Sequence, residues 1–109
     1  MRILLKGPIK GLNKTLLAQI VKIIVSYKGA EKIVLFGSRA KDAFSKISDI
    51  DIAIFAKDWS DRDINIIKHK LDEEVKIPLK FDVMNFYSLS KKSLKQNILK
   101  DGRIIYEKN

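Results

Sequence analysis

The sequence predicts a single α/β (α+β) domain in which helices pack on a mixed β-sheet. Segments with helical spacing of apolar residues alternate with short apolar segments typical of strands. The 109 residues are enough for one modest hydrophobic core and too few for two. No internal repeat or low-complexity segment interrupts this alternation. We therefore expect one domain over residues 1–109.

The first helix is expected after a loose lead-in that contains Gly7, Pro8 and Gly11. Apolar residues then recur at helical spacing as far as Tyr27. They are Leu16, Leu17, Ile20, Val21 and Ile24. Asn13 is a suitable N-cap, and Gly29 is expected to end the helix.

Two strands are expected next, on either side of a Gly-Ser turn. Ile33 to Phe36 is continuously apolar, which is typical of a strand buried on both faces. The segment 49–55 alternates instead, because side chains of a strand point to opposite faces in turn. One face carries Ile50, Ile52 and Ile54, and the other carries Asp49 and Asp51.

A second helix and a third strand follow. Ser60 is a suitable N-cap, and acidic residues occupy the first turn after it. The buried face of this helix would be Ile64, Ile67, Leu71 and Val75. Pro78 prevents the helix from continuing, so Leu79 to Phe86 is expected to form a strand with Asp82 on its polar face.

The chain is expected to close with a helix and a short strand. Ser90 would cap the helix, with Leu94, Ile98 and Leu99 facing inward. Asp101-Gly102 would end it, and Arg103 to Tyr106 would form the last strand.

The composition limits the classes of protein that this chain can represent. It has no cysteine, which excludes a disulfide framework and a thiolate zinc site. No run of about 18 apolar residues is present, so no membrane span is expected. The first residues are too interrupted for a signal peptide, and a cytoplasmic protein is the expectation.

The net charge of +9 is concentrated towards the two ends of the chain. Such an excess is able to attract nucleic acid or a nucleotide. No aromatic residues interleave the lysines along the sequence, so we interpret the charge as a solvated surface and do not favour nucleic acid as the partner. His69, the single histidine, lies on a polar helix face and is interpreted as a surface residue.

The aspartate pair on the second strand is the strongest functional signal. Asp49 and Asp51 lie two residues apart, roughly 7 Å between Cα atoms, on an otherwise apolar strand. Two carboxylates this close repel each other, and burying either one without a partner costs free energy. A divalent cation held by oxygen ligands resolves this cost.

These residues carry a resemblance to a known family. Gly37-Ser38, ten further residues and then Asp49-Ile50-Asp51 resemble the signature of the DNA polymerase β-like nucleotidyltransferase superfamily. The short chain and the string GSRAK are most similar to its minimal, MNT-type branch, and the ending LKQNILKDGRIIYE is similar as well. The chain departs from the family at Asp42, where a second glycine is usual.

The resemblance implies a nucleotidyltransferase fold with ATP as substrate and two Mg²⁺ ions as cofactors. Asp49 and Asp51 would hold the metals, and Asp82 would complete the site and act as the general base. Gly37 and Ser38 would contact the triphosphate. Two further residues, Arg39 and Lys41, would either neutralise phosphate charge or lie in solvent.

The implied function is transfer of AMP from ATP to a hydroxyl of a partner protein. MNT-type proteins resemble the antitoxin half of a pair whose toxin is a HEPN-domain protein, so a HEPN protein is the expected partner. Little of the chain remains to bind an acceptor, so activity is expected to depend on that partner. The alternative is a non-catalytic nucleotide-binding module that neutralises its partner by complex formation, which Asp42 favours. A subunit acting on an antibiotic or nucleic acid is a third possibility.

Overall fold

The computed structural model describes residues 13–37, 49–77 and 79–108 of the chain. In chain order the regular elements are α1 (Lys14–Tyr27), β1 (Lys32–Phe36), β2 (Ile50–Phe55), α2 (Asp61–Glu74), β3 (Phe81–Asn85), the 3₁₀ helix η1 (Phe86–Ser88), α3 (Lys92–Asp101) and β4 (Arg103–Glu107). Among these described residues no helix is long and apolar enough to cross a membrane.

The four strands form one mixed sheet in the order β3-β2-β1-β4, which confirms the predicted fold class. β1 pairs with β2 and with β4 in antiparallel fashion, whereas β2 and β3 run parallel. A parallel pair needs a crossover connection, and α2 provides it. The register of the parallel pair places Asp51 opposite Asp82.

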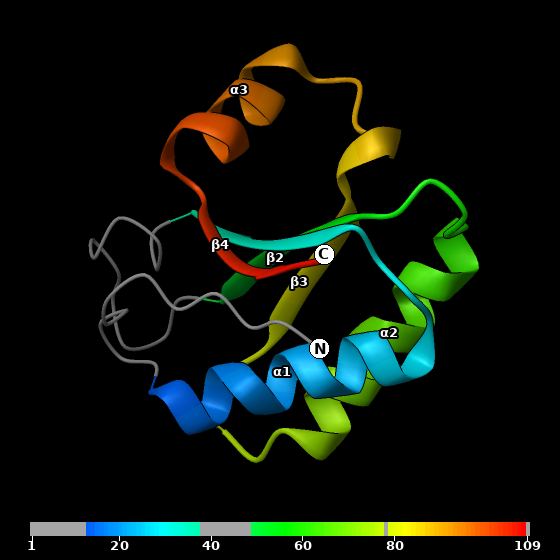
Figure 1. Cartoon of the computed structure of the whole chain (residues 1–109), viewed down its shortest axis with the longest axis vertical. Helices are drawn as coiled ribbons and strands as arrows, with labels where there is room; N and C mark the ends of the chain where they lie inside the picture. The colour runs from blue at the N-terminus through cyan, green and yellow to red at the C-terminus, as the bar shows by residue number, and fades with distance from the viewer. Residues whose placement is uncertain (1–12, 38–48, 78, 109) are drawn as a thin grey trace.

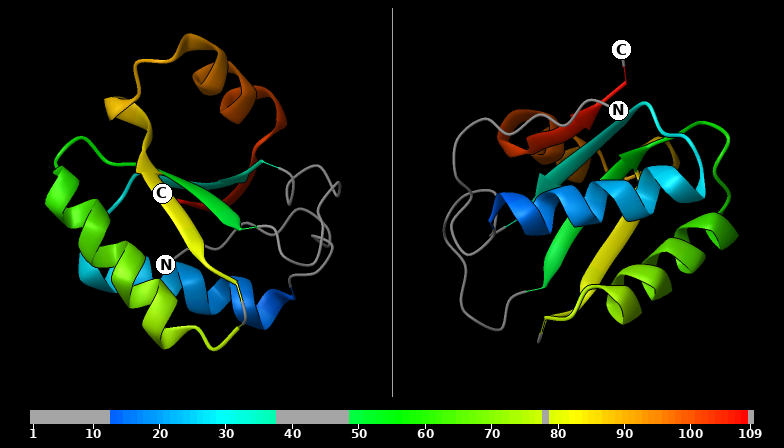
Figure 2. Two further views of the ribbon diagram at one scale, coloured as in Figure 1. Left: turned by 180° about the vertical axis from the view of Figure 1, so that it is seen from behind. Right: turned by 60° about the horizontal axis from the view of Figure 1, so that its bottom comes forward.

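Helices cover both faces of the sheet and create two hydrophobic clusters. α1 and α2 lie against one face, and α3 with η1 lies against the other (Figures 1 and 2). Ile33 and Leu35 of β1 belong to the cluster under α1 and α2, while Val34 and Phe36 belong to the cluster under α3. This confirms that the first strand is buried on both faces.

Side-chain caps explain where α1 and α2 begin. The Oδ1 atom of Asn13 accepts a hydrogen bond of 2.8 Å from the amide of Leu16, as predicted. Ser60 caps α2, and Oδ2 of Asp63 accepts a hydrogen bond of 2.8 Å from the Ser60 amide, which completes a capping box. α1 ends at Tyr27, where the predicted helical spacing also ends, with Lys28 as its C-cap and Gly29 directly after the cap.

The third strand is shorter than predicted because a side chain redirects the backbone. β3 ends at Asn85, whose Oδ1 atom accepts a bond of 3.1 Å from the amide of Tyr87. That bond starts η1, so Phe86 belongs to a 3₁₀ turn and not to the strand.

Two expectations for the last helix are wrong. α3 begins at Lys92, and its N-cap is Lys91 without a side-chain bond, so Ser90 is not the cap. Leu99 is 64% exposed, while Ile98 is buried. Neighbouring residues of a helix lie about 100° apart, so the face that buries Ile98 turns Leu99 towards solvent.

We predict that Asn85→Ala lowers the free energy of unfolding by about 2–3 kcal/mol. The buried Nδ2 group donates to the carbonyl oxygens of Ala56 and Trp59, at 2.7 and 3.2 Å. Alanine would leave both carbonyls and the Tyr87 amide without this partner. Urea unfolding measures the change, with Asn97→Ala at an exposed position of α3 as the control. Equal losses in the two variants would contradict this role for Asn85.

Candidate active site

Two of the three predicted carboxylates lie side by side on the sheet face that α3 covers. Asp51 and Asp82 are register partners on the parallel strands β2 and β3, and neighbouring strands lie about 4.8 Å apart. Asp51 alternates along β2 with isoleucines that enter the opposite cluster, so both aspartates point away from α1 and α2. Asp51 is half-buried and Asp82 is exposed. Asp49 is exposed and immediately precedes β2.

Gly37 lies directly against the Asp51 carboxylate. It follows Phe36, the residue that pairs with Asp51 across the β1–β2 ladder. Its φ angle is +78°, and a Cβ atom built there would overlap Oδ2 of Asp51. Only glycine adopts this backbone conformation at low cost and leaves room for the carboxylate. From the sequence, Gly37 was expected to let phosphate approach the backbone. Its contact with Asp51 is a second reason for glycine at this position, and only the strand pairing reveals that contact.

The electrostatic environment of Asp51 differs from that of an ordinary aspartate. Partial burial, followed by the negative charges of Asp82 and Asp49, raises the pKa of Asp51 from 3.8 to about 6. Asp82 and Asp49 each therefore lie close enough to Asp51 to repel its negative charge. At neutral pH the Asp51 side chain is mostly ionised and lacks a compensating positive charge within hydrogen-bonding distance among the described residues.

The chemistry of these donors fits a hard divalent cation, because Mg²⁺ prefers carboxylate oxygens and Asp51 would lose its repulsion on binding. In the part of the chain that the structure describes, no three acidic or histidine side chains already converge as a metal site. The convergence of Asp49, Asp51 and Asp82 on a metal therefore stays a prediction.

Part of the predicted site falls outside the described residues. These are the triphosphate contacts Ser38, Arg39 and Lys41, together with the departure from the family at Asp42. Their predicted roles stay predictions.

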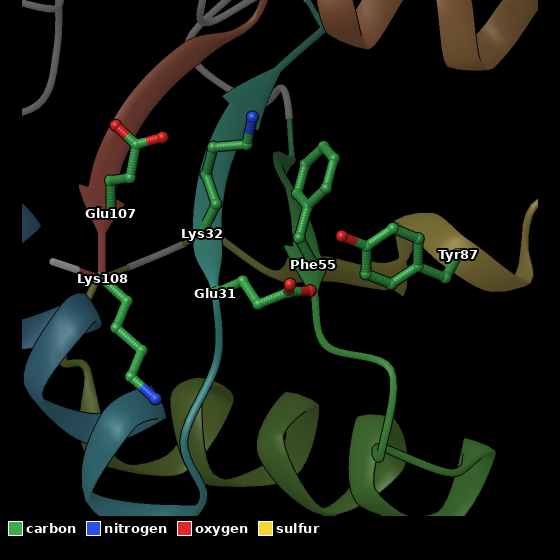
Figure 3. Close-up of a pocket in the computed structure, with 6 residues that line it drawn as sticks. All are labelled: Glu31, Lys32, Phe55, Tyr87, Glu107 and Lys108. Atoms are coloured by element: carbon green, nitrogen blue, oxygen red, sulfur yellow. The ribbon is translucent and has the colours of Figure 1, made fainter.

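A hollow of about 460 Å³ lies at the other end of the sheet. It is lined by Glu31, Lys32, Phe55, Tyr87, Glu107 and Lys108 (Figure 3). Phe55 is the last residue of β2, whereas Asp51 is its second, so the hollow is separate from the carboxylate pair. Two acids and two lysines balance its charge, and Glu31 accepts a hydrogen bond from the Tyr87 hydroxyl.

Lysines and aromatic rings meet in space although they do not interleave along the sequence. Phe55 and Phe86 stack with centroids 4.2 Å apart, and Tyr87 lies edge-on to both. The ammonium groups over these rings are Lys32 on Phe55 at 4.6 Å, Lys95 on Phe86 at 5.4 Å and Lys57 on Tyr87 at 5.8 Å. The sequence did not predict these contacts, because they join residues from separate segments of the chain.

The fold and the paired carboxylates define a domain of the nucleotidyltransferase class. The family described as Polymerase beta, Nucleotidyltransferase matches residues 18–109, and the chain belongs to this family. The predicted resemblance is thereby confirmed. No curated protein matches the sequence.

Solved structures with a similar fold include toxin–antitoxin complexes. A chain of a toxin–antitoxin with AMP-PNP has a TM-score of 0.74 and 24% identity, over 84% of this chain and 73% of that one. A chain of a mutant of the toxin–antitoxin MntA-HpeT has a TM-score of 0.74 and 23% identity, over 89% of this chain and 75% of that one. A chain from the structure of a tri-AMPylated Shewanella oneidensis HEPN toxin in complex with MNT antitoxin has a TM-score of 0.71 and 22% identity, over 89% of this chain and 74% of that one. At these identities the likeness shows the fold.

We predict that Gly37→Ala displaces the Asp51 carboxylate and destabilises the chain, because the added Cβ would overlap Oδ2 and the positive φ disfavours alanine. The expected loss is about 1–3 kcal/mol in thermal or urea unfolding. Gly29→Ala is the matched control, since nothing lies within 4 Å of a Cβ at that position. In the background of Asp51→Ala, the cost of Gly37→Ala should fall; an unchanged cost would show that the contact does not matter.

We predict that Asp51→Asn stabilises the chain at pH 7 and not at pH 3.5. The folded pKa of about 6 lies above the unfolded value, so the contribution of Asp51 to stability falls as pH rises from about 4 to 6. After allowance for solvent screening, we expect a gain of about 1 kcal/mol at pH 7. Urea unfolding of both proteins at both pH values measures it. If Asp51→Asn were less stable than wild type at pH 7, the conclusion that the charge of Asp51 destabilises the folded chain would be contradicted.

Proposed function

We propose that this chain is a Mg²⁺-dependent nucleotidyltransferase that transfers AMP from ATP to a hydroxyl of a partner protein, and that the partner is a HEPN-domain toxin. The observation that carries the proposal is the register pairing of Asp51 with Asp82 beside the Gly37 turn. Membership of the nucleotidyltransferase family supports the reaction class. The AMP-PNP and the AMPylated toxin named for structures of similar fold support the nucleotide and the acceptor.

Each residue has a defined task in this proposal. Asp49, Asp51 and Asp82 would hold two Mg²⁺ ions, which when bound polarise the α-phosphate and lower the pKa of the attacking hydroxyl. Asp82, on the edge strand and exposed, would accept the proton of that hydroxyl. The hydroxyl oxygen would bond to the α-phosphorus as the bond from the α-phosphorus to the β-phosphate breaks, and pyrophosphate would leave. Gly37 leaves space for the Asp51 carboxylate and for backbone contact with the triphosphate, to which Ser38 would contribute. Arg39 and Lys41 would neutralise phosphate charge.

The acceptor is proposed to come from the partner. The described residues around Asp51 and Asp82 supply carboxylates and a glycine turn, and the hollow in Figure 3 lies at the opposite end of β2. Orientation of an attacking group is worth roughly 7–11 kcal/mol of the barrier. We propose that this contribution is supplied only when a partner docks at the α3 face and presents its hydroxyl.

A second candidate is a non-catalytic nucleotide-binding module that neutralises its partner by complex formation. Asp42 favours it, since this residue replaces the usual glycine of the family and adds a negative charge close in sequence to the proposed triphosphate contacts. In this case the partner would be inhibited without being modified.

We predict that the isolated chain turns over ATP at close to background rate, and that a HEPN-domain partner raises the rate by orders of magnitude. After incubation with Mg-ATP, mass spectrometry should detect AMP on the partner. Asp51→Asn should abolish the added mass because it removes a ligand, whereas the matched control Asp58→Asn, at an exposed position outside the site, should keep it.

Two outcomes would contradict the proposed reaction. Stable complex formation without modification, with all three aspartates intact, would favour the binding module. Efficient AMP transfer to a small molecule by the isolated chain would show that no partner is needed.

A further inference from the structure

We propose that Asp72 of α2 is a positioning residue for Asp82: by holding the backbone at Phe81, it fixes the start of β3 and so places the Asp82 carboxylate beside Asp51. This inference rests on the proposed role of Asp82 in the function above. Asp72 lies outside the predicted site, next to the edge of β3 that does not pair with β2.

The backbone immediately before Asp82 is held from both sides. β3 is an edge strand, and alternate amides of an edge strand point away from the sheet. Towards β2, the amide of Ile50 donates to the carbonyl of Lys80 at 3.0 Å. Away from β2, the amide of Phe81 donates to Oδ1 of Asp72 at 2.9 Å. Among the described residues no strand pairs with β3 on this side, and at Phe81 the Asp72 carboxylate accepts the hydrogen bond that such a strand would accept.

Asp72 is itself well anchored. Its Oδ2 atom accepts a hydrogen bond of 3.0 Å from Lys68, one helical turn earlier. The adjacent Leu71 is fully buried under the sheet, which fixes the helix. Burial raises the pKa of Asp72, but the hydrogen bonds from the Phe81 amide and Lys68 outweigh it and hold the pKa below its ordinary value. Asp72 is thus an ionised acceptor at neutral pH.

Asp82 depends on its backbone for its position. Its exposed side chain makes no hydrogen bond or ion pair with the residues that the structure describes. The buried ring of Phe81, 1% exposed, fixes the depth of the strand against α2. The Asp72 bond fixes the direction of the Phe81 amide, and with it the Lys80–Phe81 peptide unit, which ends one residue before Asp82. A loss of this bond would move the carboxylate relative to Asp51 without removing either ligand.

The test compares Asp72→Ala, which removes the acceptor, with Asp72→Asn, which retains an acceptor oxygen at the same place. Glu73→Ala, the exposed neighbour on the same helix, is the matched control. Amide hydrogen exchange at residues 81–83 gives a readout without metal, and electron paramagnetic resonance with Mn²⁺ measures affinity. For Asp72→Ala we expect faster exchange at Phe81 and about tenfold weaker Mn²⁺ binding. Asp72→Asn and Glu73→Ala should match wild type.

The outcomes separate the inference from the proposed function. Mn²⁺ binding that is unchanged in Asp72→Ala, or equally weakened in Asp72→Asn, would overturn the inference alone. A wild-type chain that binds no Mn²⁺ would overturn the proposed function and this inference with it. If Asp72→Ala does not fold, Asp72→Glu takes its place, because it keeps a carboxylate but displaces it by one methylene. Weaker Mn²⁺ binding in Asp72→Glu would support the inference, and wild-type affinity would overturn it.

Discussion

The position of the Asp51 carboxylate, between the Gly37 turn and Asp82, is the constraint on which the site depends. The antiparallel pairing of β1 with β2 brings Gly37 against Oδ2 of Asp51, and the parallel pairing of β2 with β3 brings Asp82 alongside. A shift of either register by one residue would turn a carboxylate towards the hydrophobic cluster under α1 and α2. The aliphatic residues of β2 that fill this cluster therefore also fix the site.

The two faces of the sheet differ in role: one packs against most of the hydrophobic core, and the other carries the paired aspartates. The larger cluster lies under α1 and α2, and α2 also supplies the Asp72 acceptor that holds the start of β3. The other face is covered by α3, of which only Ile98 is buried. Asp51 and Asp82 lie on this less covered face, where the proposed nucleotide and partner would bind. The elements packed on the opposite face thus hold the strands that carry the two carboxylates.

Most of the fold was predictable from sequence because its signals are local, as in the capping box at Ser60. Predictions failed where a residue outside the periodic pattern determines the end of an element. Asn85, for example, ends β3 through a side-chain hydrogen bond that the periodicity of the sequence does not predict. For the site, the spacing of Gly37 and the aspartates predicted metal and nucleotide chemistry, and the structure places Gly37, Asp51 and Asp82 side by side. Its supports were not predictable. The contact of Gly37 with Asp51 requires the β1–β2 register, and the bond accepted by Asp72 requires the packing of α2 against an edge strand.

The electrostatics of Asp51 bear on whether this site binds metal and nucleotide or serves only to dock a partner. With a pKa of about 6, this carboxylate is mostly charged at pH 7 while Asp49 and Asp82 repel it, and the folded state bears that cost. Asparagine at this position would keep the shape of the side chain and remove the repulsion. A module that neutralises its partner through surface contacts alone derives no benefit from the charge. A chain that binds a cation at this site does, because the cation turns mutual repulsion into shared attraction. The unfavourable charge is therefore better explained by metal and nucleotide binding than by docking alone.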